Sequence, residues 1–223
     1  MPLERIDEER IRTIAQMMKE MPKIEILRFL LPKSPDTILG ELERKLDLLH
    51  GGLLVFPSRL FDIQRLLTEL DMTIFLIVPS LIVRQRLAQR YHIAEELLDI
   101  QIIESSYQRL DGSIGTLELF ALQQNAPGIT EALRETERTY EYENHIAFVP
   151  YDPHTFQEVV ETFTASGFEY DGGGINPVEN AHTTVTYLSH RIQRRRIELQ
   201  TYQFDRQTSF VKPTLPLRRE KKG

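Results

Sequence analysis

The sequence predicts an α+β fold in which two βαβββ modules form one curved mixed sheet, a half-barrel bowl, with extra N-terminal helices. Strand-like and helix-like segments follow one another as β-α-β-(α)-β-β over 51–122 and as β-α-β-β-β over 145–204. Each half ends in an apolar strand with one central acid, Glu118 or Glu198. Because alternate side chains of a strand share a face, the polar groups of these strands gather on one side of the sheet.

Two amphipathic helices are expected in an N-terminal helical extension over 1–49. The segment 6–21 places isoleucines and methionines at helical spacing, with acids in its first turn. The segment 34–49 opens with Ser34 as the expected N-cap and Pro35 at the first helical position. The apolar stripes indicate packing faces. The residues leave open whether these helices cover the outer face of the sheet or mediate a dimer.

The first module is expected over 50–124 and carries one insertion. Its last two strands are joined across Asp111 and Gly112, a pair typical of hairpin turns. The segment 80–98 indicates an inserted helix that a minimal module lacks. The remaining elements are a helix at 58–70 and strands at 51–57, 72–79, 99–107 and 115–122.

The second module is expected over 145–204, after a polar linker over 125–144. Asp152 is predicted to cap its helix and Gly167 to end it. The glycine-rich stretch 171–182 lacks a following helix, so it is not a phosphate loop. It is interpreted as a mobile loop, with a lid over the bowl as one role. The strands are expected at 145–151, 168–173, 182–190 and 194–204.

The two halves align along their sequences, with one ambiguity. A shift of 93 residues (156 − 63 = 93) matches the apolar positions of the two helices and sets Pro57 against Pro150. It sets Gly52 against His145, whereas a shift of 95 (145 − 50 = 95) restores His50 but misaligns the helices. A strand–helix connection two residues longer in the first half reconciles the two shifts. A step of two residues keeps His50 on the same face.

Alternation along the strands predicts a cluster of ionisable side chains. His145 lies on the face opposite Ile146 and Phe148, which point into the helix-packed core. The two strand-centre glutamates likewise lie opposite their apolar neighbours. The bowl is therefore expected to be lined by His50, Glu118, His145 and Glu198.

The predicted cluster has the donor set of a metal site. Two imidazoles and two carboxylates suit a borderline-to-hard divalent ion such as Fe, Mn, Ni, Co or Zn. The chain has no cysteine, which excludes disulfides, zinc–thiolate sites and thiol nucleophiles. An ion also explains how a mid-strand glutamate is tolerated, because burying it unpaired would cost roughly several kcal/mol. His182 and His190 flank another strand with the same parity, and either is an alternative to His50.

Three segments carry a resemblance to a known family. HIAFVP at 145–150, RRIELQ at 195–200 and GTLELF at 115–120 resemble the vicinal oxygen chelate superfamily, which includes glyoxalase I, extradiol dioxygenases and several epimerases. The resemblance covers about 50–204. It implies paired βαβββ modules around a metal bowl. It also implies ligands from the histidine that opens the first strand and the glutamate central in the last, which are here His145, Glu198, Glu118 and His50.

The resemblance implies three functional classes. The first is a metal-dependent lyase or isomerase of glyoxalase or epimerase type, which acts on a small oxygen-chelating substrate through an enediolate-like intermediate, with Glu118 and Glu198 catalytic. The second is a non-haem Fe(II) ring-cleavage or keto-acid dioxygenase, whose two histidines and one carboxylate leave three open positions. It becomes comparable if Glu118 or His50 lies outside the site. The third is a metal-free small-molecule-binding module, which Gly52 at a ligand position would favour.

Composition and charge limit the partners. The 33 acids and 27 bases give a net charge of −6, which argues against a general nucleic-acid binder. No apolar run approaches the roughly 20 residues that span a bilayer, and the N-terminus lacks the apolar segment of a signal peptide. We therefore expect a cytoplasmic protein with a small-molecule substrate, no nucleic acid and no membrane partner. A homodimer stays open, and 205–223 is expected to be a basic, flexible tail.

Overall fold

The computed structural model describes residues 3–178, 181–190 and 192–203. Within these ranges, only the backbone is described for 175–178, 181–183 and 202–203. The tail predicted over 205–223 lies outside these residues. In the part of the chain that is described, no helix has the length and apolarity to cross a membrane.

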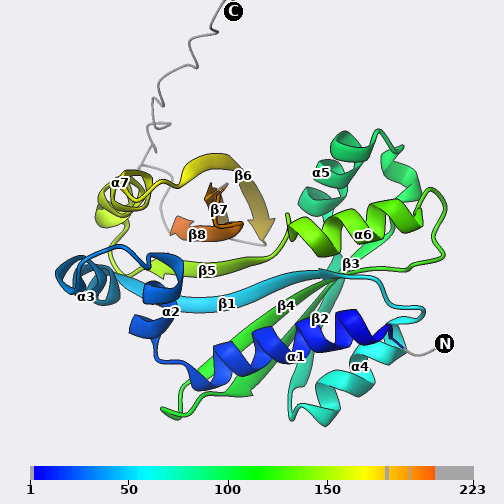
Figure 1. The fold of residues 1–223 in the computed structure, drawn as a ribbon, viewed down its shortest axis with the longest axis horizontal. Coiled ribbons are helices and arrows are strands. Elements are labelled where there is room, and N and C mark those ends of the chain that lie inside the picture. Colours follow the sequence, from blue (N-terminus) through cyan, green and yellow to red (C-terminus); the bar gives the residue numbers. More distant parts are fainter. Residues whose placement is uncertain (1–2, 179–180, 191, 204–223) are drawn as a thin grey trace, which may run out of the picture.

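Eight strands form a single mixed sheet in the order β2-β3-β4-β1-β5-β8-β7-β6 (Figure 1). The first half is β1 (Leu46–Val55), α4 (Leu60–Glu69), β2 (Thr73–Pro79), β3 (Ile100–Gln108) and β4 (Ile114–Leu122). The second is β5 (His145–Pro150), α7 (Phe156–Ala165), β6 (Glu169–Val178), β7 (Ala181–His190) and β8 (Arg195–Gln203).

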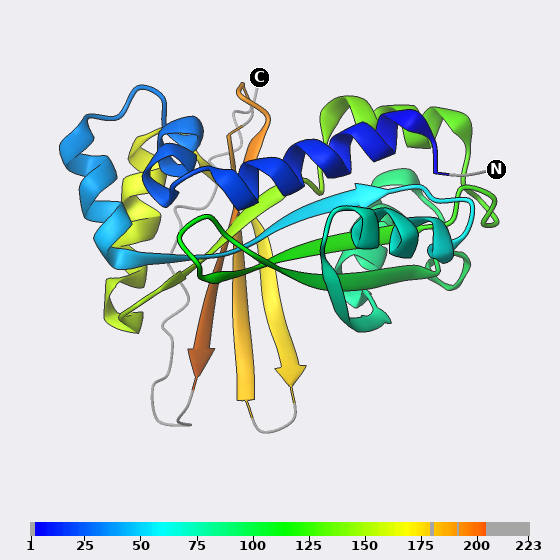
Figure 2. The ribbon, with the colours of Figure 1, turned by 90° about the horizontal axis from the view of Figure 1, so that it is seen from below.

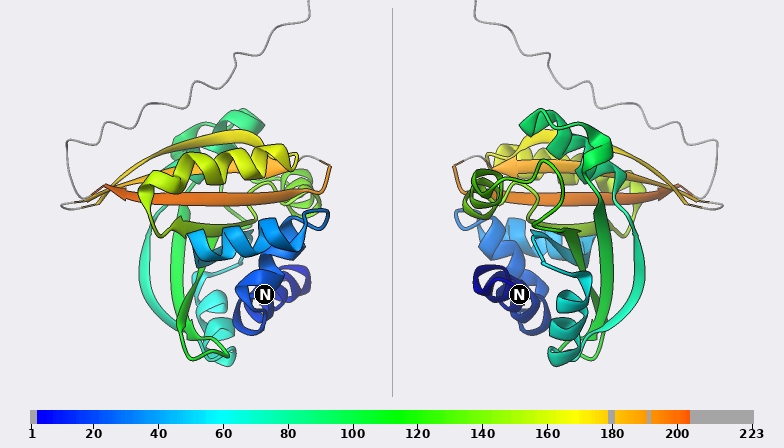
Figure 3. Two further views of the ribbon diagram at one scale, coloured as in Figure 1. Left: turned by 90° about the vertical axis from the view of Figure 1, so that its left-hand side faces the viewer. Right: turned by 90° about the vertical axis from the view of Figure 1, so that its right-hand side faces the viewer.

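The two halves have the same strand order and meet at β1 and β5, which pair antiparallel. Within each half the first and last strands pair in parallel, β1 with β4 and β5 with β8. Strands β6, β7 and β8 run across the direction of β2, β3 and β4 in the end-on views of Figure 3. The prediction of an α+β fold with two βαβββ modules in one curved sheet is confirmed.

One face of the sheet is covered by helices. Buried side chains of α1 (Arg5–Glu20), α2 (Lys23–Leu30), α3 (Asp36–Lys45), α4 and α7 share one apolar core with alternate residues of the central strands, where β1 changes parity at a register shift between Leu48 and His50. Helix α1 lies along β1 (Figure 2). Gly51 permits this approach, because a Cβ there would lie 2.9 Å from the Ile14 side chain. Of the two roles left open for the N-terminal helices, the fold shows the first, covering the sheet.

The opposite face carries two further helices at one end. Helix α5 (Leu81–Tyr91) is the predicted insertion, and α6 (Glu131–Tyr140) follows the first half. Val83 and Leu87 of α5 and Leu133 of α6 pack on Leu54 and Phe120 of the sheet in a second apolar cluster. Because the strand parity of Leu54 and Phe120 is also that of His50 and Glu118, this face holds the predicted polar cluster. We call it the site face.

The predicted boundary at residue 50 is four residues late. The helix expected over 34–49 ends at Lys45, and β1 begins at Leu46. The spacing of Leu46 and Leu48 in the sequence predicts one more helical turn, but both residues pair with β5. The ladder buries them on the helix-covered face, which decides in favour of a strand. Ser34 is not the cap, since Pro35 holds that position without a side-chain cap.

Two other segments differ from expectation. The segment predicted as a polar linker over 125–144 contains α6, which Thr130 caps by accepting a hydrogen bond from the Leu133 amide. The loop predicted over 171–182 is wrong as far as residue 178, because β6 continues to Val178. Gly173 belongs to this ladder, since a Cβ there would lie 2.3 Å from the Val185 carbonyl oxygen. Gly173 thus permits the close pairing of β6 with β7.

Candidate metal centre

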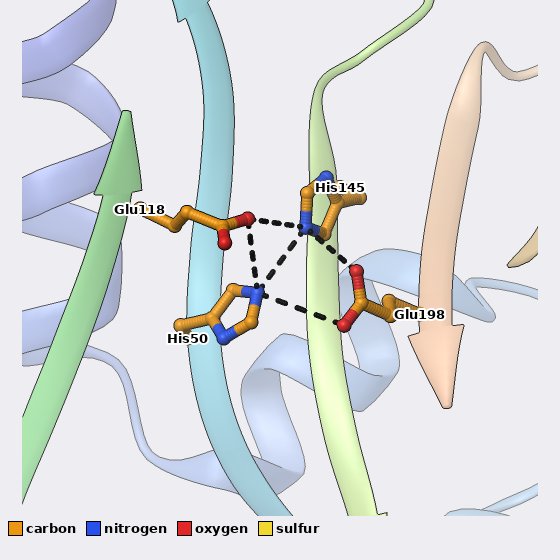
Figure 4. Close-up of side chains that lie close together, drawn as sticks. All are labelled: His50, Glu118, His145 and Glu198. Carbon is orange, nitrogen blue, oxygen red and sulfur yellow. Dashed lines mark hydrogen bonds and ion pairs between the residues drawn. The ribbon is translucent and has the colours of Figure 1, made fainter. Parts of the chain in front are cut away.

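The four predicted side chains meet on the site face, one from each of four adjacent strands. His50 comes from β1, Glu118 from β4, His145 from β5 and Glu198 from β8 (Figure 4). One donor atom of each lies within 4.8 Å of the others. Three of the residues are buried and Glu118 is partly buried. The seam between the two modules thus carries one histidine and one glutamate from each.

The strand register explains which histidine is the counterpart of His145. Glu118 lies opposite Gly52 in the β1–β4 ladder, and Glu198 lies opposite Ala147 in the β5–β8 ladder. Each glutamate therefore faces the residue two positions after its module's histidine (52 − 50 = 2; 147 − 145 = 2). The strands thus follow the shift of 95, which makes His50 the counterpart of His145.

Gly52 makes room for the site. It pairs with His145 across the β1–β5 seam. A Cβ at position 52 would lie 2.0 Å from Cε1 of the His145 imidazole, far inside any non-bonded contact. Only glycine at position 52 leaves room for the His145 ring over β1. Gly52 is therefore not a lost ligand, and the feature that favoured a metal-free module has another cause.

The geometry fits four donors around one ion. The Nε2 atoms of His50 and His145 are 3.2 Å apart, and each lies 3.6 Å from Oε2 of Glu118. Glu198 oxygens lie 3.2 Å from His145 Nε2 and 4.0 Å from His50 Nε2. Donors about 2.0–2.2 Å from a shared ion lie roughly 3 to 4.4 Å from one another. All five separations fall in that range, and the donor set has the chemistry of a divalent site.

The backbone fixes the orientation of His145. Its Nδ1 lies 2.9 Å from the carbonyl oxygen of Glu143. A carbonyl only accepts, so Nδ1 carries the proton and donates it there. In the neutral ring Nε2 then presents a lone pair to the cluster, which is the arrangement of a metal-ligating histidine.

Burial sets the charge of the cluster. Desolvation lowers the pKa of His50 to about 4, against the opposing charge of Glu198, so this imidazole is neutral at pH 7. Desolvation also raises the pKa of Glu118 well above its usual range, and the charge of Glu198 adds to the effect. For Glu198 burial is outweighed by the imidazoles of His145 and His50, and its pKa is lowered. Without a cation, burial therefore favours the protonated form of Glu118, while Glu198 favours its ionised form.

Glu198 is held by two neighbours. The Gln200 amide donates to its Oε1 at 2.6 Å. Tyr187, opposite Glu198 in the β7–β8 ladder, hydrogen-bonds to it as well. Burial raises the pKa of Tyr187 well above its usual value, so the phenol keeps its proton and donates. The Tyr187 ring in turn lies under the guanidiniums of Arg86 at 4.8 Å and Arg196 at 4.2 Å.

A buried carboxylate outside the cluster joins these supports. Glu143 is 1 % exposed and pairs with Arg86 at 3.1 Å, Arg90 at 2.9 Å and Arg196 at 3.2 Å. Two of these arginines come from α5 and one from β8. Since the Glu143 carbonyl also holds His145, this residue ties the inserted helix to a cluster histidine. We call Glu143 with its three arginines the Glu143 hub.

A cavity of about 530 Å³ opens over the cluster. It is lined by His50, Glu118 and Glu198, by the start of α5, and by Glu104 of β3. Glu104 faces Glu118 across the β3–β4 ladder. Burial raises its pKa, and Glu198 adds to this. The sequence interpretation missed Glu104, although it is a further acid inside an apolar strand, with the same signal as Glu118.

The two alternative histidines fall elsewhere. His190 packs on Phe168, and its Nδ1 accepts a hydrogen bond from the backbone N–H of Gln193. It is not among the grouped donors found in the described chain. The side chain of His182 lies outside the described residues.

Comparisons with known proteins add the following. No family model matches the chain, and no curated protein matches it. Among solved structures, a Streptomyces coelicolor methylmalonyl-CoA epimerase has a TM-score of 0.40 at 14 % identity, covering 69 % of this chain and 95 % of its own. A 4-hydroxymandelate synthase mutant from the same organism has 0.45 at 9 %, covering 70 % and 49 %. A glyoxalase family protein from Enterococcus faecalis has 0.22 at 11 %, covering 70 % and 97 %. The paired modules and the sheet order described above are those that the resemblance of the sequence to the vicinal oxygen chelate superfamily implies.

Proposed function

We propose that the chain is a divalent-metal-dependent enzyme of glyoxalase or epimerase type, an isomerase or lyase for a small oxygen-chelating substrate. The observation that carries the proposal is the meeting of two imidazoles and two carboxylates beneath an open cavity. His50, Glu118, His145 and Glu198 would hold the ion, which is Fe, Mn, Ni, Co or Zn. Bound there, a divalent ion supplies Lewis acidity toward the substrate oxygens.

Proton movement at the substrate falls to the carboxylates. Glu118 and Glu198 are the predicted catalytic pair, and both line the cavity. Glu104 stands on the same wall but outside the four-donor cluster, so it can exchange a proton while the cluster residues serve as ligands. Burial raises the pKa of Glu104, which is the direction that favours proton exchange over permanent ionisation. We assign proton transfer at the substrate carbon to Glu104, together with the predicted pair.

Metal uptake is the first test. Reconstitution with each of the five ions is expected to give one ion per chain and to raise the melting temperature by about 5–10 °C at a hundredfold excess over Kd. His50→Ala is expected to lose most of the uptake. His190→Ala is the matched control, because it removes an imidazole of the same fold outside the cluster, and it should bind normally. Metal analysis and differential scanning calorimetry measure both quantities.

The same measurements separate the alternatives. Uptake below about 0.1 ion per chain, with no thermal shift, would instead support the metal-free binding module. A dioxygenase requires Glu118 to stay off the ion, so that three positions are open. With Fe(II) and a panel of catechols and keto acids, we expect no oxygen consumption, and instead exchange of a substrate C–H proton with deuterated solvent. Oxygen uptake would contradict the isomerase or lyase proposal.

Metal affinity is expected to increase with pH. The proton on Glu118 must leave before the carboxylate binds a cation, so binding releases it. His50 does not compete above about pH 5, because its pKa is about 4. Kd should therefore fall by up to about tenfold per pH unit while Glu118 titrates. Calorimetry in buffers of different ionisation enthalpy counts the proton. A Glu118→Gln variant should show a flatter profile, and a flat wild-type profile would contradict this charge assignment.

A further inference from the structure

The cavity walls define a class of substrate, an inference that rests on the proposed function. We propose that the substrate is a small molecule with an apolar, uncharged body, which carries its polar oxygens only at the chelating end. Such a molecule has no carboxylate, phosphate or nucleotide part away from the centre.

The charged side chains that line the cavity favour neutral ligands. Glu104, Glu118 and Glu198 are acids, and no lysine or arginine lines the cavity among the residues that the structure describes. With a doubly charged cation in place, the two cluster carboxylates bring the centre to neutrality. Glu104 is a further acid on the wall, so the wall offers no positive charge to an anionic group. A second anionic group on the substrate would meet repulsion in a partly desolvated space, where charges interact more strongly than in water.

The arginines that approach the site are used elsewhere. Arg86 and Arg196 stack on the Tyr187 ring, which itself lines the cavity. Both pair with Glu143. Their guanidiniums are thus committed to the Glu143 hub and do not offer a partner for an acidic substrate group.

The rest of the lining is mostly apolar, with Ser80, Thr116, Tyr187 and Gln200 as its polar members, and the first turn of α5 contributes part of it. Ile82, in the first turn of α5, lies 3.8 Å from the place a Cβ would take on Gly174 of β6. The insertion therefore reaches from the β2 edge of the sheet to the β6 edge and roofs the cavity. At about 530 Å³ the space suits a small molecule. Its apolar walls are Leu49, Val78, Leu81, Ile82, Ile102 and Phe120.

Two hydroxamates of matched length test the inference. Octanohydroxamate carries a bidentate oxygen chelator on an apolar chain, and suberic acid monohydroxamate carries the same chelator with a terminal carboxylate. Titrated into the metal-loaded protein, the first is expected to bind at least about tenfold more tightly, because the second must bury or misplace its charge. Leu81→Arg, at an exposed position of the lining, is expected to raise the affinity for the carboxylated probe. The ratio of the two dissociation constants should therefore move toward one.

The outcomes separate the two proposals. Normal metal uptake with equal or tighter binding of the carboxylated probe would overturn the substrate class and leave the metal function standing. Absence of metal uptake, so that neither probe binds, would overturn both. A neutral preference that Leu81→Arg leaves unchanged would show that the cavity is not where the chain of the probe lies, and would also overturn the inference.

Discussion

Replacing Gly52 by alanine is expected to destroy the metal centre while the fold persists. The added methyl would lie 2.0 Å from the His145 ring, which is buried and held at Nδ1 by the Glu143 carbonyl. The ring has to leave its place, and His145 Nε2 leaves the cluster with it. We expect metal affinity to fall by about a hundredfold or more, since a shifted ligand costs at least as much as a lost outer-shell partner. Metal titration followed by calorimetry measures the loss.

The neighbouring glycine provides the matched control. Gly51 lies on the same strand but faces α1, where a Cβ would meet the ends of the Ile14 and Met18 side chains at 2.9–3.1 Å. Gly51→Ala is expected to cost about 1–3 kcal/mol by overpacking and to leave metal affinity unchanged. If both variants bind metal like the wild type, His145 is not a ligand. If both lose binding equally, the effect is one of stability and not of the site.

Replacing Glu143 by glutamine is expected to weaken both the fold and the site. The change leaves three guanidiniums around a neutral group in a position that is 1 % exposed. Removing one partner of a buried ion pair costs roughly 3–5 kcal/mol. Arg90 keeps Glu137 and Arg196 keeps Asp171, so the lower end is expected. That corresponds to a fall of about 6–12 °C in melting temperature for a chain of this length.

The same substitution, Glu143→Gln, is also expected to weaken metal binding. Loosening the Glu143 hub frees the carbonyl that orients His145 and the arginines that stack on Tyr187. Metal affinity is expected to fall about 10- to 100-fold. Glu141→Gln is the control, because the side chain of Glu141 is 36 % exposed, against 1 % for that of Glu143. It should cost less than about 1 kcal/mol and leave the metal affinity intact. Unchanged affinity in Glu143→Gln would show that the hub only supports the fold.

The site was predictable from the sequence to the extent that alternation along strands determines it. One acid inside an apolar strand fixes a face, so Glu118 and Glu198 could be placed together without any contact information. His50 could not be placed by spacing alone. In the sequence, the apolar pattern of the two helices aligns at a shift of 93 residues, whereas a shift of 95 is needed to set His50 against His145. Only the pairing of Gly52 with Glu118 and of Ala147 with Glu198 resolves it.

What the sequence could not show depends on tertiary contacts. At the start of β1, Leu46 and Leu48 fit the helical period as well as the strand period, so the sequence alone predicts that the preceding helix continues through them. Their pairing with β5 makes this segment a strand. In helix α6 only Leu133 and Glu137 are buried, so the segment has too few apolar positions at helical spacing to predict a helix. The Glu143 hub joins residues that lie about 50 positions apart, and nothing in a local pattern indicates that its arginines share one carboxylate.

The seam between β1 and β5 has a consequence for how the chain folds. It joins residues 95 positions apart (145 − 50), and closing so large a loop is slow compared with forming either hairpin. Half of the donors come from each side, so an isolated half would present only one imidazole and one acid. Capture of a cation should therefore coincide with the docking of the two halves. In a refolding experiment, the absorbance of bound Co(II) would report that late step, independently of the earlier growth of helix signal.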